Sequence, residues 1–322
     1  MPLLAVFTAA TDVGDARRRP GKSTAAYACC LFLASSAQCF IARRDAAGWG
    51  MVATLLYSIA GGMLSVLATS RVEQIAWKFL RLVGFIVLAI ASGATVWSFR
   101  SASLPLDLGM KAIVGLGVLL ALGAIVAVLA SPLAARRQPS FRWVCGFFGI
   151  AGIAAASVSA VTTLRGGVDS RPHLPAAAPL VILSQLLGAL MLGSITVAWL
   201  LGHAYLTATR MTIAPLRHFS LMLSWTVAAR IVFMLVSMAI AWQVGGDPTS
   251  PILLRVAQSW LIVVLRVGVG LIAVAVFAYL VSDCVRLRST QSATGILYFG
   301  SVMAYVGELA GQQLIHEFGW PM

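Results

Sequence analysis

Charged side chains are scarce in this chain. They make up 10 per cent of the 322 residues, whereas 60 per cent are hydrophobic and the mean hydropathy is +0.93. A water-soluble domain does not need so large an apolar fraction to fill its core, so the composition excludes that class. The chain is therefore predicted to be a polytopic membrane protein.

Familiar catalytic and metal-binding motifs are also missing. The stretches between the apolar runs are far shorter than the roughly 50 residues that a small independent domain needs, which excludes a soluble catalytic domain. The sequence contains no HExxH, no DxxxD pair and no GxSxG elbow. The five cysteines show neither CxxC nor Cys/His ligand spacing, so we expect buried thiols and no metal site.

Nine apolar runs are each long enough to cross a bilayer, whose hydrocarbon core takes about 20 residues per helix. Segments such as VGLGVLLALGAIVAVLA are apolar on every side, whereas the strands of a membrane β-barrel alternate every second residue. We therefore predict an all-α transmembrane helical bundle. The runs cover 24–42, 49–69, 78–98, 110–130, 143–163, 178–203, 219–242, 254–282 and 292–316.

The first run has a second interpretation. RRRPGK and the apolar residues after it could form a signal peptide that is cut after the SSA at 35–37. However, the basic stretch lies behind an apolar start, and the hydrophobic run continues through CFIA. We expect a retained first span, and cleavage would leave eight helices.

Lysine and arginine are distributed unevenly between the two sides of the predicted bundle. Fourteen lie near helix ends on the side of the N-terminus and seven on the opposite side. Because positive joints resist translocation, we predict a cytoplasmic N-terminus and an external C-terminus in a cell inner membrane. The basic residues are spread over every joint, so the net charge of +13 indicates topology and anionic membrane lipids as partners, and no nucleic acid.

The two halves of the chain differ in character. Residues 24–163 are rich in small side chains, as in GIAGIAAASVSA, which allow helices to approach closely in lipid, and we predict a scaffold there. Residues 178–316 carry a buried polar layer. Residues 1–23 are expected to form a cytoplasmic tail and 317–322 an external one.

Three charged residues lie well inside predicted spans: Arg230 in the seventh, Arg266 in the eighth and Glu308 in the ninth. Each costs about 2.5 to 3.5 kcal/mol at a helix centre, so they should face one another or a wet cavity. Counted from the outer ends of their helices, they fall within about 6 Å of each other in depth. Two arginines facing one carboxylate leave a positive charge that would bind an electron-rich group, so we predict these three as catalytic residues.

Further polar residues extend this layer. Tyr305, Glu308 and Gln312 fall on one face of the last helix, at i, i+3 and i+7. Gln185, near the outer start of the sixth span, lies at a similar depth. We predict that Gln185, Tyr305 and Gln312 bind a ligand, while the structural alternative is that Glu308 pairs with one arginine and locks the bundle.

A second cluster lies in GHAYLTATRMTIAPLRH, residues 202–218, on the predicted cytoplasmic side. His203 and His218 flank this joint and are further candidates for ligand binding. Histidines at helix ends are typical of interfacial hydrogen bonding, whereas haem ligands lie deeper and are paired across two helices. We therefore expect neither haem nor metal at these histidines.

The sequence YVGELAGQQL, in the last run, resembles the final helix of polytopic anchor subunits of the NrfD and DmsC type. The matching residues are Gly307, Glu308, Leu309 and Gly311, and Gln312 stands where an arginine is expected. This resemblance implies a subunit that passes electrons between membrane quinone and a peripheral oxidoreductase. It therefore implies protein subunits as partners and quinone as the cofactor.

The leading hypothesis is an integral subunit of a respiratory or other redox complex, with a quinone-accessible pocket toward the outer leaflet. Arg266 or Arg230 would donate a hydrogen bond to a quinone oxygen, and Glu308 would accept its proton. A transporter or channel for a small anion or a proton-coupled solute is the alternative, although the sequence shows no internal repeat. A purely structural membrane subunit is the third possibility.

Overall fold

The described part of the chain is helical, as predicted. The computed structural model describes residues 50–101, 107–134, 138–167, 174–207, 213–245 and 259–321, which belong to one compact unit, Ala47–Met322. These residues contain no strand. Eight helices are long and apolar enough to cross a membrane, and they confirm the second to ninth predicted runs. The first run, 24–42, lies outside the described residues.

The helices follow one another along the chain with turns between them. The first described helix is Gly50–Thr69. It is followed by η1 (Val72–Gln74), α3 (Trp77–Ser101), α4 (Leu108–Ala130), η2 (Ser131–Leu133), α5 (Gln138–Gly167), α6 (Leu174–Thr207), α7 (Ala214–Gly245), α9 (Trp260–Val264), η3 (Leu265–Ala273), α10 (Val274–Arg286) and α11 (Thr290–Phe318).

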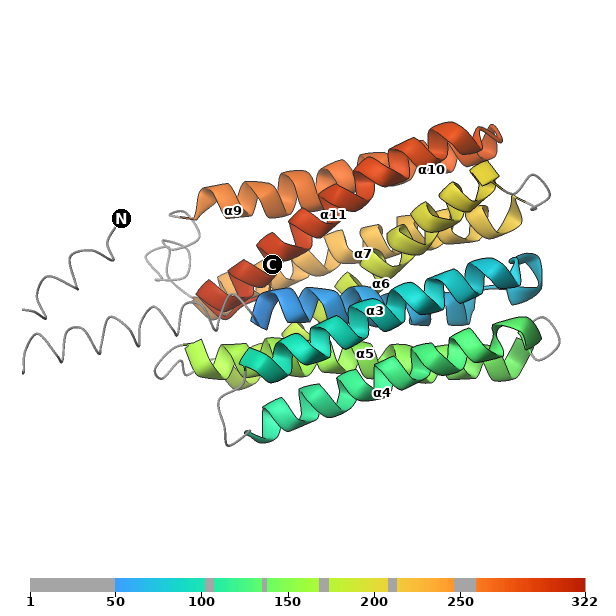
Figure 1. Ribbon diagram of the computed structural model, residues 1–322. Coiled ribbons are helices and arrows are strands. Elements are labelled where there is room, and N and C mark those ends of the chain that lie inside the picture. The colour runs from blue at the N-terminus through green and yellow to red at the C-terminus, as the bar shows by residue number, and fades with distance from the viewer. Residues whose placement is uncertain are drawn as a thin grey trace, which may run out of the picture. The chain divides into compact units, whose positions relative to one another are not determined.

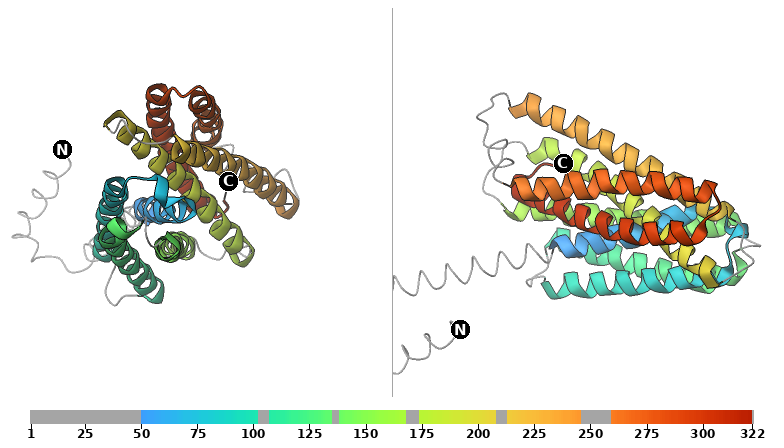
Figure 2. Two further views of the ribbon diagram at one scale, coloured as in Figure 1. Left: turned by 90° about the vertical axis from the view of Figure 1, so that its right-hand side faces the viewer. Right: turned by 90° about the horizontal axis from the view of Figure 1, so that it is seen from above.

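Consecutive helices pack side by side. Helix α3 packs on α4, α4 on α5, and α5 on α6 (Figure 1). Helix α11 packs against α6, η3 and α10, so it lies among the C-terminal helices (Figure 2). The polar face of α11 therefore has neighbours on several sides.

The surface of the bundle carries large apolar side chains. Trp143 is 79% exposed, Trp225 is 75% exposed and Leu129 is 72% exposed. Lipid tails solvate such side chains, whereas water does not. Together with the eight spans, this surface identifies an integral membrane protein with a multi-pass helical bundle.

Helix spacing depends on small residues where backbones meet. A Cβ atom on Gly62 would lie 1.9 Å from the carbonyl oxygen of Ala189, and one on Gly193 would lie 2.2 Å from the carbonyl carbon of Gly62. The helix Gly50–Thr69 and α6 therefore touch through their backbones. Such contacts contribute packing energy in lipid, where burying apolar side chains gains little.

The eighth span contains a feature that the sequence did not predict. Residues Leu265–Ala273 form a π-helix, η3, which continues α9 and precedes α10. A π-helix adds residues to each turn and is found frequently at functional sites. Hydrophobic periodicity could not predict it, because nearly every residue around it is apolar. The first residues of the predicted run, 254–258, lie outside the described residues, and the described helix begins at Trp260.

The residues predicted to form an external tail, 317–322, are packed on the bundle as far as they are described. Helix α11 continues to Phe318 and ends at Gly319, whose φ of 70° favours glycine. The buried indole of Trp320 donates from Nε1 to the carbonyl oxygen of Ser237 at 3.1 Å and to its hydroxyl at 2.9 Å. Ser237 in turn donates to the carbonyl of Pro321, so this segment is anchored to α7.

Candidate functional site

Arg230, Arg266 and Glu308 lie together, as the depth argument predicted. Arg230 Nη2 donates to Glu308 Oε2 at 3.0 Å, and Arg266 Nη1 donates to Glu308 Oε1 at 3.0 Å. The side chains are 2%, 1% and 3% exposed. We call these three residues the ion triad. It joins α7, η3 and α11, with both carboxylate oxygens occupied.

The two arginines also donate hydrogen bonds to backbone carbonyls and to a hydroxyl. Arg230 Nη1 donates to the carbonyl of Ser184 at 2.5 Å and to its hydroxyl at 2.9 Å, which connects α6 to the ion triad. Arg266 Nη1 also donates to the carbonyl of Gly307 at 3.0 Å. Arg230 Nε is buried and has no hydrogen-bond partner within the part of the chain that the structure describes. One strong donor of the ion triad is therefore unused.

Glycines make the space for these charged groups. A Cβ atom on Gly188 would lie 3.0 Å from Glu308 Oε2, and one on Gly311 would lie 2.9 Å from Arg266 Cζ. A Cβ on Gly307 would lie 2.1 Å from the Cα of Gly270, so η3 and α11 touch through their backbones. The GELAG sequence therefore supplies a carboxylate, a close helix contact and room for a guanidinium.

Gln185 and Gln312 form a pair of reciprocal hydrogen bonds beside the ion triad. Gln185 Nε2 donates to Gln312 Oε1 at 3.0 Å, and Gln312 Nε2 donates to Gln185 Oε1 at 2.9 Å. Both residues are buried, and Gln312 lies one helical turn beyond Glu308. The pair bridges α6 and α11. Its role in ligand binding stays a prediction.

Tyr305 lies one turn before Glu308 on the same face of α11. Its hydroxyl is 2.9 Å from the hydroxyl of Thr196, on α6, and either group can donate. Sequence reasoning missed Thr196 and Ser184, although Ser184 directly precedes the predicted Gln185. The polar pair SQ in an otherwise apolar run was a usable signal, whereas a single threonine in GSIT was not.

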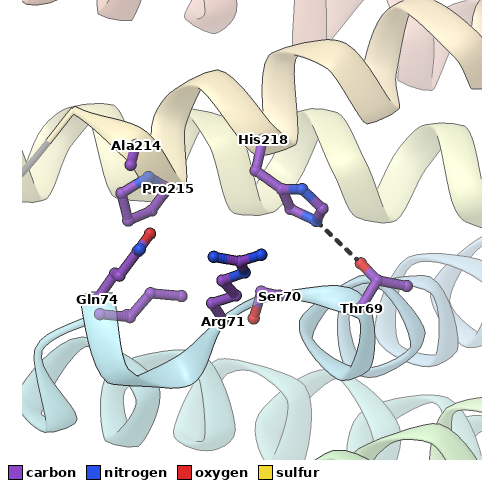
Figure 3. A pocket seen from close by; sticks show the side chains of 8 residues that line it. Thr69, Ser70, Arg71, Gln74, Ala214, Pro215 and His218 are labelled. Carbon is purple, nitrogen blue, oxygen red and sulfur yellow. Dashed lines mark hydrogen bonds between the residues drawn. The ribbon is translucent and has the colours of Figure 1, made fainter.

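The histidines lie apart from the ion triad. His203 is exposed near the end of α6, and His218 is half-buried in the second turn of α7, with Nε2 3.3 Å from the Thr69 hydroxyl (Figure 3). Twelve residues of α7 separate His218 from Arg230, which corresponds to about 18 Å along the helix. His218 therefore belongs to a separate site, and a shared ligand with the ion triad is not supported.

Two cysteines lie within the described residues. Cys145 is buried and Cys284 is half-buried, and both are free thiols. Cys29, Cys30 and Cys39 lie outside the described residues. No three His, Cys, Asp or Glu side chains come together as a metal site within the described ranges.

Chemically, the ion triad combines two guanidinium groups with one carboxylate inside a bundle surrounded by lipid. The carboxylate organises both arginines, and one positive charge remains in excess. Comparison of the chain with protein-family models, curated proteins and solved structures returned no match. The resemblance of YVGELAGQQL to NrfD and DmsC type anchors therefore stays a prediction.

Proposed function

We propose that the chain is a membrane subunit of a redox complex and that a quinone binds at the ion triad. The observation that carries the proposal is the convergence of Arg230 and Arg266 on the single carboxylate of Glu308. One arginine is sufficient to neutralise Glu308. The second adds a buried charge that costs about 2.5 to 3.5 kcal/mol, and neutralisation of Glu308 does not require it.

The excess charge favours a ligand with oxygen lone pairs. A quinone carbonyl is such a group, and a guanidinium is a strong donor to it. Arg230 Nε is the unused donor, and the Arg230 guanidinium carbon lies 5.8 Å from the ring centre of the buried Phe233. A quinone oxygen at Nε would therefore have an aromatic ring nearby for its own ring to contact. Local movement of these side chains would be needed to admit the ligand.

The residues would contribute to quinone chemistry in different ways. Oxidation of a quinol releases two electrons and two protons, and reduction of a quinone takes up the same number. The arginines would hold the quinone oxygen and stabilise negative charge on it. Glu308 binds both guanidinium groups through its two oxygens and would position the arginines. When one guanidinium moves to the ligand, the freed carboxylate oxygen would accept a proton from the quinol. A peripheral partner subunit would carry the electrons, as the resemblance implies.

Quinone titration of the purified protein tests this proposal. The informative variant is Arg230→Met, because it removes the excess charge and the unused donor but leaves the pair of Arg266 and Glu308 neutral. Thr226→Val, one turn away on α7, is the matched control, since it changes a buried hydroxyl that contacts neither arginine. We expect saturable quenching of tryptophan fluorescence by a quinone analogue in the wild type and in Thr226→Val. Arg230→Met should not bind, and equal binding by all three proteins would refute the proposal.

One observation favours a structural role as the second candidate. Both oxygens of Glu308 are already bonded to arginine, as expected for a lock between three helices. If the lock is the whole function, Arg230→Met should alter assembly of a complex while the turnover of each assembled complex stays unchanged. A fall in turnover without loss of assembly favours the quinone site.

A further inference from the structure

A pocket of about 430 Å³ lies near the first turns of α7, about 18 Å along that helix from the ion triad. Its lining comes from two places far apart in the sequence. Thr69, Ser70, Arg71 and Gln74 come from the end of the first described helix and the turn and η1 that follow it, and Ala214 and His218 come from α7 (Figure 3). The volume is within the range of about 300 to 1,000 Å³ that is typical of small-molecule sites.

The lining groups are suited to an anion. The Arg71 guanidinium extends between Gln74 and His218, and a guanidinium, an amide and an imidazole can all donate hydrogen bonds (Figure 3). The hydroxyls of Thr69 and Ser70 already donate to backbone carbonyls of the first described helix. Among the residues that the structure describes, no acidic side chain lines the pocket. Within the described ranges, Arg71 forms no ion pair. Its charge is therefore available to a ligand.

The surroundings reinforce this positive charge. Arg142 is held next to the pocket because its Nε donates to the carbonyl of Ala68 at 2.7 Å, and Arg71 and Arg142 both interact electrostatically with His218. Other basic residues begin or end helices at the same end of the bundle: Lys78, Arg81, Arg217, Arg286 and Arg288. The described acids there are the exposed Glu73 and the half-buried Asp283, and Asp283 Oδ1 is 2.9 Å from Arg286 Nη2.

The position of the pocket indicates the kind of anion. It lies where membrane-spanning helices end, which is the depth of lipid headgroups. The lysine and arginine bias predicts that this is the cytoplasmic side, and basic pockets between helices on that side bind anionic headgroups. Arginine in particular offers paired donors that match the oxygens of a phosphate.

We propose that this pocket binds a phosphate group, and that an anionic phospholipid headgroup supplies it. Arg71 binds the phosphate oxygens, and Gln74 and His218 donate to the remaining oxygens or to the glycerol of the headgroup. The acyl chains lie along the apolar outer surface of the helices. This site is independent of the quinone site, so either proposal can fail alone.

Native mass spectrometry of the full chain in detergent tests the proposal with three probes: phosphatidylglycerol, phosphatidylcholine and inorganic phosphate. Arg71→Gln removes the central charge, whereas Ala214→Leu fills the pocket without changing charge. Arg81→Gln is the control, because it removes one exposed arginine at the same end that does not line the pocket. We expect phosphatidylglycerol to bind more tightly than phosphatidylcholine. Its affinity should fall at least about fivefold in Arg71→Gln, which corresponds to about 1 kcal/mol for one basic residue.

The other results are equally decisive. Ala214→Leu should lower the affinity for phosphatidylglycerol as well, and it replaces Arg71→Gln if that variant does not fold. Equal losses in Arg71→Gln and Arg81→Gln would show only diffuse surface charge and overturn the site. Binding of inorganic phosphate that depends on Arg71, without preference for phosphatidylglycerol, would keep the phosphate chemistry and overturn the lipid as its source.

Discussion

The substitution Glu308→Gln should lower the free energy of unfolding far more than the loss of either arginine does. It removes the carboxylate that binds both guanidinium groups at 3.0 Å and leaves two buried positive charges. A glutamine oxygen can accept from one guanidinium but neutralises neither. Breaking a buried ion pair in this way costs about 3 to 5 kcal/mol, which is comparable with the whole free energy of unfolding of many proteins, about 5 to 15 kcal/mol.

Arg230→Met has a smaller net effect because two contributions oppose each other. The acceptors on Ser184 and one oxygen of Glu308 lose their donor, which costs about 1 to 3 kcal/mol. Removal of the excess positive charge returns about 2.5 to 3.5 kcal/mol. The free energy of unfolding should therefore lie between about 0.5 kcal/mol below and about 2.5 kcal/mol above the wild-type value. Arg266→Met should behave similarly, since it leaves Arg230 paired with Glu308.

Denaturant unfolding in a single detergent, monitored by far-ultraviolet circular dichroism, measures the free energy of unfolding of the wild type and of Glu308→Gln, Arg230→Met and Arg266→Met. Yield of monodisperse protein provides a second comparison if Glu308→Gln is too unstable to measure. We expect Glu308→Gln to be the least stable variant by a clear margin. If Arg230→Met loses as much stability as Glu308→Gln, then the second arginine is balanced by another group and the charge is not in excess.

Three further predictions concern the packing around the ion triad, and each is read from thermal unfolding in detergent. Gly307→Ala should lower the free energy of unfolding by about 1 to 3 kcal/mol, because the added Cβ would lie 2.1 Å from the Cα of Gly270. Gly115→Ala is the control, since its Cβ would have no atom within 4 Å, and it should cause no such loss. Equal effects of the two substitutions would contradict the close contact. Gln185→Leu alone should lower the free energy of unfolding by about 1 to 3 kcal/mol, because it leaves the amide of Gln312 without its partner. The double variant with Gln312→Leu should lose less, since it leaves no unpaired amide. A purely additive loss would show that the two amides do not act as a pair. Trp320→Phe should lose about 0.5 to 1.5 kcal/mol with the indole hydrogen bond, and no change would mean that the C-terminal segment is not anchored.

Much of the fold could be predicted from the lengths of the apolar runs alone. Runs of about 20 apolar residues must form helices in lipid, because unpaired backbone groups are too costly there. The same cost argument predicted that Arg230, Arg266 and Glu308 meet, although they are separated by up to 78 residues in the sequence. Rare charges in an apolar sequence are therefore strong indicators of mutual contact.

Other features could not be predicted because they depend on local geometry that composition does not encode. The π-helix containing Arg266 has the same apolar sequence character as an α-helix. The pocket at His218 requires Thr69, which lies 149 residues earlier in the chain, and Arg71 from the turn that follows it. Nothing in the sequence indicates that these residues approach His218. The burial of Trp320 against Ser237 depends on how α11 ends, and sequence reasoning assigned that segment to an external tail.

The most direct test of the quinone site is whether quinone stabilises the protein through Arg230. Thermal unfolding of the wild type and Arg230→Met should be compared in one detergent, with and without a saturating quinone analogue. A ligand that binds only the folded state raises the unfolding midpoint by mass action. We predict similar midpoints without quinone and a rise only in the wild type. An equal rise in both proteins would contradict the role of the ion triad.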